Sequence, residues 1–196
     1  MIKRMITLVF IITVIFLSCY DGVQDAYEEG RGYKLGDRGP AGGWIFYLNP
    51  NYKADGWRYL EAAPEDQSDA EYWINWGSSP NPQATLNGKT SVGIGSGKSN
   101  TEAIIAQAGH TNSVAVKCRN YRGGGYDDWF LPSYDELDQM RINLHLSGVV
   151  PFAADTYWSS SEYDSDEVYT IYFSTVPLVL RLKTSTANMA RAVRRF

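Results

Sequence analysis

The stretch GGYDDWFLPSYDELDQM (residues 124–140) decides most about the fold, because it contains a clear helix start. Pro132 favours an extended chain before the helix. Ser133 and Glu136 have the spacing of a capping box, in which the serine oxygen accepts from the glutamate N–H and the carboxylate accepts from the serine N–H. The stretch therefore predicts a helix that begins directly after Ser133.

The residues that follow predict which face of this helix is buried. Leu137, Met140 and Leu144 recur at i, i+3 and i+7, as on the apolar face of a helix. The polar residues Asp135, Asp138 and Arg141 fall elsewhere and are expected in solvent.

A second helix is predicted from Ser99 and Glu102, which repeat the capping-box spacing, and it should end at Gly109. The preceding segment GIGSGKS (93–99) resembles a phosphate-binding loop, but Val92 stands where that motif requires glycine. A glycine-rich loop before a capped helix accounts for the segment, and no nucleotide is expected.

Strands are predicted on both sides of these helices. Residues 44–48 and 56–64 are two candidates near the start of the domain. After Pro151, four β-rich runs with short connections predict an antiparallel meander: 156–163, 168–173, 178–184 and 189–196. The expected fold class is α+β, with two helices in the middle and a mixed or antiparallel sheet built from both ends of the chain.

The N-terminal residues predict export from the cytoplasm. Lys3 and Arg4 precede an apolar run too short to span a bilayer, and FLSC follows, so residues 1–18 read as a signal peptide. FLSC resembles a lipobox, which predicts lipid attachment at Cys19, with an unlipidated secretory signal as the alternative. Residues 19–33 are acidic and are expected to form a lipidated tether, followed by one domain at 34–196.

The charge of the chain argues against nucleic-acid partners. Removal of the signal peptide would leave sixteen cations against twenty-two anions, a net charge of −6. Cys118 would then be the only cysteine besides Cys19, and it is expected to behave as a small buried hydrophobe.

No catalytic residue, metal site or cofactor is predicted. His110 and His145 lack partners at metal-ligand spacing. The acidic loop EYDSDE (162–167) lacks the glycine of a short calcium loop and is expected to be a solvated turn. The aromatic cluster Tyr72, Trp73 and Trp76 fits either a core or a partly exposed surface.

Three motifs resemble one bacterial family. Trp129 to Leu137, Tyr157 to Ser161 and Arg191 to Arg195 resemble the signature of the domain typified by the C-terminal domain of the Legionella collagen-like adhesin, although Ala190 stands where valine is usual. GDRGPAGGWIFY (36–47) and GWRYLEAAP (56–64) are similar to the opening of lipoproteins that carry this domain.

The resemblance implies a C-type-lectin-like fold with paired N- and C-terminal strands and a ligand surface in the C-terminal half. It implies an adhesin or receptor that binds an unknown protein or glycan, anchored through its lipid in the bacterial cell envelope, at the outer membrane or cell surface. The alternative is a secreted enzyme of the related formylglycine-generating fold, or a hydrolase. The cysteine pair of that enzyme branch and the calcium-binding triplet of sugar-binding lectins are both missing.

The segment VPLVLRLK (176–183) has two interpretations. Its alternation predicts an amphipathic strand with Leu178, Leu180 and Leu182 turned inward. Some members of the resembled family are diversified by retroelements, which cannot create Trp, Gln, Lys, Met or Glu, and none of these occurs in residues 168–182. On this second interpretation the ligand-binding residues are Tyr169, Ile171, Tyr172, Val176, Leu178, Leu180 and Arg181.

Overall fold

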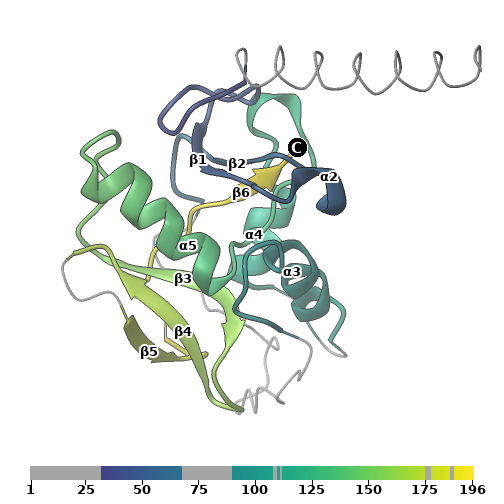
Figure 1. Cartoon of the computed structure of the whole chain (residues 1–196). Helices are drawn as coiled ribbons and strands as arrows, with labels where there is room; N and C mark the ends of the chain where they lie inside the picture. The colour runs from purple at the N-terminus through teal and green to yellow at the C-terminus, as the bar shows by residue number, and fades with distance from the viewer. Residues whose placement is uncertain (1–31, 68–89, 108–109, 111, 175–177, 186–187) are drawn as a thin grey trace, which may run out of the picture. The chain divides into compact units, whose positions relative to one another are not determined.

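The computed structural model describes residues 32–67, 90–107, 110, 112–174, 178–185 and 188–196, and its compact unit spans Lys34–Phe196 (Figure 1). The elements are β1 (Trp44–Leu48), α2 (Tyr52–Asp55), β2 (Tyr59–Ala62), α3 (Gly97–Ile105), α4 (Val114–Asn120), the 3₁₀ turn η1 (Gly123–Gly125), α5 (Tyr134–Met140), the π-helical η2 (Arg141–Leu146), β3 (Thr156–Glu162), β4 (Glu167–Tyr172), β5 (Leu178–Leu182) and β6 (Val193–Arg195). This content confirms the α+β class. No helix in the described residues is long and apolar enough to cross a membrane.

The first sheet joins the two ends of the domain. Its order is β1-β2-β6, and both pairs are antiparallel. Ile45 and Phe46 of β1 are completely buried, as are Leu60 and Ala62 of β2. The C-terminal strand therefore pairs with the second strand of the domain, whereas the expectation was a direct pair between the terminal strands.

The second sheet contains the other three strands in the order β3-β4-β5, again antiparallel. The predicted four-stranded meander is wrong in its last strand, because residues 189–196 leave this sheet. Met189 forms a parallel bridge to Tyr157, Val193 forms an antiparallel bridge to Phe130, and β6 then pairs with β2. The C-terminal segment thus runs from one sheet to the other, as Figure 1 shows in yellow.

Buried ion pairs explain why the C-terminal segment crosses between the sheets. Arg191 contacts Asp66 at 2.6 Å, and Arg194 contacts both Glu61 at 3.2 Å and Asp128 at 2.8 Å. Both arginines are buried, so each needs a carboxylate partner, and those carboxylates lie outside the β3-β4-β5 sheet.

Helix α5 forms as its sequence predicts. Ser133 caps it with both hydrogen bonds of a capping box to Glu136, and Leu137, Met140 and Leu144 are completely buried. The helix packs on β1, β3 and β4. The expected exposure of Arg141 is wrong, because its guanidinium is buried, pairs with Asp138 at 2.8 Å and donates to the Ser174 carbonyl.

Helix α3 begins three residues earlier than predicted. Ser96 is its N-cap residue, whereas Ser99 lies inside the first turn and donates to the Ser96 carbonyl. The helix ends at Ile105, and Gly109 lies outside the described residues. A carboxylate distant in sequence, described below, replaces the local cap.

Helix α4 was not predicted, and with α2 it makes the expected total of two helices wrong. Ser113 caps α4 by accepting from the Val116 N–H. Cys118 on this helix is completely buried in the core, which confirms the expected role of its side chain as a small hydrophobe. Burial raises the pKa of this thiol far above its ordinary value.

Candidate functional site

An exposed apolar surface lies on the edge strand β5. By register, Leu178, Leu180 and Leu182 stand beside Ile171, Tyr169 and Glu167 of β4, so their side chains share one face of the sheet. Leu178 is 50% exposed and Leu182 is 52% exposed, while Leu180 is partly buried. We call this surface, completed by Tyr163 and Tyr169, the leucine face.

The expectation that the leucines turn into the core is therefore wrong. Helix α5 covers this face at β3 and β4, and Figure 1 shows β5 at the outer edge of the sheet, away from the helix. A helix is about 10 Å wide and strands lie about 4.8 Å apart, so one helix covers roughly two strands. The leucines lie on the same side of the sheet as α5, but the helix does not extend over β5.

Tyrosines border the leucine face where it meets α5. The ring of Tyr169 packs against Tyr134 of α5 at 5.3 Å and against Tyr163 at 5.4 Å between ring centroids. Tyr163 is 52% exposed and was missed as a candidate residue, although it is the last residue of the predicted strand 156–163. These rings add broad, rigid contact area beside the leucines.

The remaining candidate residues do not form one surface. Tyr172 and Arg181 are exposed, but the two-residue period of a strand places them on the face opposite to the leucines. Ile171 is completely buried in the core, so its expected exposure is wrong. Val176 lies outside the described residues, as does the aromatic cluster at 72–76.

A buried ion pair anchors the end of β5. Lys183 contacts Glu162 at 2.9 Å, and the two side chains are 1% and 2% exposed. Lys183 alternates with the leucines in the sequence pattern, yet its side chain is buried. The pair ties the strand to the acidic loop and thereby holds the leucine face in place.

The carboxylates of Glu162 and Asp164 in the acidic loop 162–167 are already bound to other groups of the protein. Besides the Glu162 ion pair, the Asp164 carboxylate accepts hydrogen bonds from the N–H groups of Asp166 and Glu167, both at 2.8 Å. These bonds lower the pKa of Asp164. Within the described part of the chain, no group of three or more His, Cys, Asp or Glu residues is arranged to hold a metal ion.

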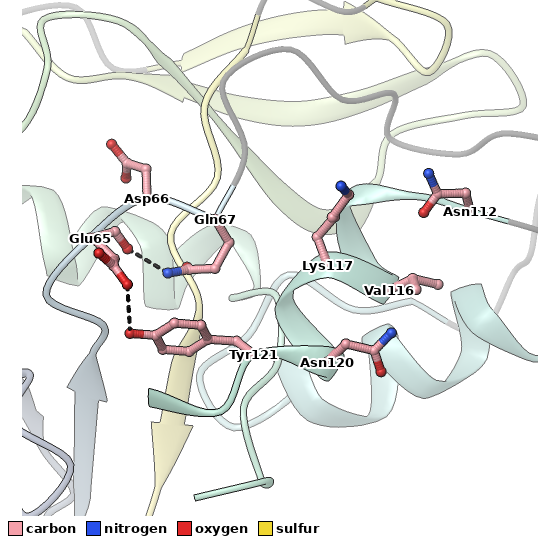
Figure 2. Close-up of a pocket in the computed structure, with 8 residues that line it drawn as sticks. All are labelled: Glu65, Asp66, Gln67, Asn112, Val116, Lys117, Asn120 and Tyr121. Atoms are coloured by element: carbon pink, nitrogen blue, oxygen red, sulfur yellow. Dashed lines mark hydrogen bonds between the residues drawn. The ribbon is translucent and has the colours of Figure 1, made fainter. Parts of the chain in front are cut away.

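Figure 2 shows a polar pocket of about 500 Å³ between the segment after β2 and helix α4. It is lined by Glu65, Asp66, Gln67, Asn112, Val116, Lys117, Asn120 and Tyr121. Several of these groups already serve the fold: Asp66 pairs with Arg191, Gln67 accepts from the Ala192 N–H, and Tyr121 donates to Glu65. The pocket was not foreseen from the sequence, because its two walls are about fifty residues apart.

The glycine-rich loop 93–99 surrounds a carboxylate of the protein itself. Glu136 is completely buried and accepts from the Gly95 N–H at 2.9 Å and from the Ser133 N–H at 2.8 Å. A Cβ atom on Gly97 would collide with this carboxylate, so glycine is required there. The loop that resembles a phosphate-binding motif therefore holds the Glu136 side chain.

Cys118 and Ser113 are two candidate nucleophiles, and both are buried. Cys118 is buried, and its raised pKa keeps the thiol protonated. His110 Nε2 lies 3.1 Å from Ser113 Oγ. Ser113 is only 1% exposed and its oxygen caps α4, so this pair is part of the helix start.

Comparison with known proteins adds no family to these observations. No protein-family model matches the chain, and no curated protein is significantly similar to it.

Proposed function

We propose that the protein is a lipid-anchored binding module of the adhesin or receptor type that acts outside the cytoplasm. The leucine face carries this proposal, because Leu178 and Leu182 are large apolar side chains left half-exposed on one face of an edge strand. Water contact of such side chains is unfavourable, and apolar surface that is kept exposed is typical of a contact site. Tyr163 supplies further contact area at its border.

The proposed fold is the C-type-lectin-like one. Two observations support it: the C-terminal strand joins the N-terminal sheet, and the C-terminal half presents its own sheet at the surface. Trp129 and Tyr157 of the resembled motifs are both completely buried, each in one of the two core clusters. The rival proposal, an enzyme that uses Cys118, requires a thiolate where the structure buries a protonated thiol.

The ligand is proposed to be a protein or glycan of the host or of the cell envelope. Leucine and tyrosine side chains favour an apolar contact. Arg181 points to the opposite face of the strand and is not part of this contact surface. We also propose that a retroelement diversifies this region, but only at the exposed candidate positions. A near-repeat of the 3′ end of the gene that differs only at adenines would support it, and a genome without one would refute it.

The test compares two variants of the purified full chain on a glycan array and in pull-downs from envelope extracts. The double variant Leu178→Ser, Leu182→Ser should lose at least roughly tenfold in binding, since two half-exposed contact residues become polar. The control is Leu48→Ser, which changes a 42% exposed leucine on β1, at the edge of the other sheet. Equal binding by wild type and the double variant would refute the proposed surface.

A further inference from the structure

We infer that β5 pairs with β5 of a second copy of this chain, and that the two copies form one continuous sheet across a two-fold axis at Leu180. The inference concerns the edge of the strand and does not depend on the proposed function. Within the described residues, β5 pairs with β4 alone, and none of these residues forms a strand at its outer edge.

The register shows which backbone groups point to this outer edge. In an antiparallel pair, residues alternate between those that bond to the neighbouring strand and those whose N–H and C=O point away from it. The Lys183 N–H donates to the Asp166 carbonyl at 2.8 Å, and by alternation Arg181 and Val179 also bond toward β4. The outward-pointing residues are therefore Leu178, Leu180 and Leu182.

These three residues are spaced for pairing with themselves. In an antiparallel arrangement centred on Leu180, this residue faces its own copy, and Leu178 faces Leu182 of the second copy. Every outward N–H and C=O from Leu178 to Leu182 then meets a partner. Leucine side chains also lie opposite one another on a single face, and such apolar cross-strand pairs stabilise a sheet.

The neighbouring registers are less favourable. A two-fold axis at Arg181 would place two like charges directly opposite each other, which destabilises a strand pair. An axis at Val179 would leave Leu182 without a partner in β5. The axis at Leu180 places Arg181 opposite Val179 instead, and it pairs all three outward residues.

The outward-pointing positions of this edge carry no charge, and the one charged residue within β5, Arg181, lies opposite Val179 when the axis is at Leu180. Edge strands are usually protected by lysine, by proline within the strand or by inward-pointing charge. Here all three outward positions are leucine, and the lysine that follows the strand is buried in its ion pair with Glu162. A closed two-fold contact uses the same surface on both copies and needs no other partner.

Sedimentation velocity of the full chain in a mild detergent tests this inference over about a hundredfold range of concentration. Wild type should shift from monomer to dimer. Leu180→Glu and Leu180→Lys should each raise the dimer dissociation constant by roughly tenfold or more, because position 180 faces its own copy and each variant opposes like charges. An equal mixture of the two variants should recover a dimer, since Glu then faces Lys.

Recovery in the mixture separates loss of pairing from loss of folding, because misfolded variants would not rescue each other. Leu48→Glu, on the edge strand of the other sheet, should leave the wild-type equilibrium unchanged. A wild type that stays monomeric, or a mixture that does not dimerise, would overturn the inference. Ligand binding retained by monomeric Leu180→Lys would show that pairing and ligand binding are separate properties.

Discussion

Glu136 is a single buried residue that organises two helix starts. Its carboxylate accepts from the Ser133 N–H at the start of α5 and from the Gly95 N–H in front of α3. Burial raises its pKa from 4.5 to about 6, although these hydrogen bonds favour the charged form. The folded protein therefore binds this proton more tightly than the unfolded chain does.

This pKa predicts a measurable pH dependence of stability. The contribution of the bound proton is fully present below about pH 4.5 and is lost as the pH rises through about 6. Relative to Glu136→Gln, the unfolding free energy of wild type should fall by about 2 kcal/mol between about pH 4 and about pH 7. Urea unfolding at several pH values measures this difference. The control is Glu102→Gln, at an exposed position on α3, whose unfolding free energy should follow that of wild type at every pH. A difference in unfolding free energy between wild type and Glu136→Gln that does not vary with pH would contradict the assignment.

At the scale of one element, the β4–β5 hairpin depends on the Lys183–Glu162 pair. Both side chains are almost fully buried, so each charge depends on the other for compensation. Lys183→Ala would leave the Glu162 carboxylate buried without its cation and should cost about 3–5 kcal/mol of unfolding free energy. Hydrogen exchange should accelerate first in β4 and β5, because the pair joins the end of β5 to the end of β3.

Two further variants make this prediction specific. The double variant Lys183→Met, Glu162→Gln removes both charges and should recover most of the lost stability. Arg181→Ala changes an exposed cation two residues away and should be nearly neutral. A Lys183→Ala protein as stable as wild type would show that the pair contributes little.

At the scale of the whole molecule, the C-terminal segment unites the two sheets. Arg191 and Arg194 are buried and bind carboxylates from other parts of the domain, while the Met189 and Val193 bridges place the chain between them. Truncation before this segment would remove β6 and both arginines together. The two sheets of the domain are therefore held together by this segment.

The proposed anchor predicts a modified N-terminus. Mass spectrometry of protein taken from membranes of a bacterial host should find residues 1–18 removed and acyl chains on Cys19. Cys19→Ser should abolish acylation and shift the protein from the membrane to the soluble fraction, because lipid chains supply the membrane affinity. Cys118→Ser is the matched control and should stay acylated. A mature N-terminus at any other residue would refute the anchor.

The sequence alone predicts the features whose causes are local. The capping box and apolar spacing of α5 lie within twelve residues, and the structure confirms both. The first three strands of the C-terminal half and the burial of Cys118 were also predicted correctly. Residues close together in the sequence determine helix caps and the alternation of residues in a strand, so both can be predicted from the sequence.

Only the tertiary structure determines which faces of the helices and strands are buried and which elements pack against them. Helix α3 starts early because Glu136, about forty residues later, reaches its N-terminal loop. The C-terminal strand leaves the predicted meander because its arginines find carboxylates around the other sheet. The alternating residues of β5 distinguish the two faces of the strand, but they do not reveal that α5 covers β3 and β4 without reaching β5. The leucines were therefore expected in the core, whereas Leu178 and Leu182 are exposed. Burial depends on contacts between residues far apart in the chain, and no local pattern contains them.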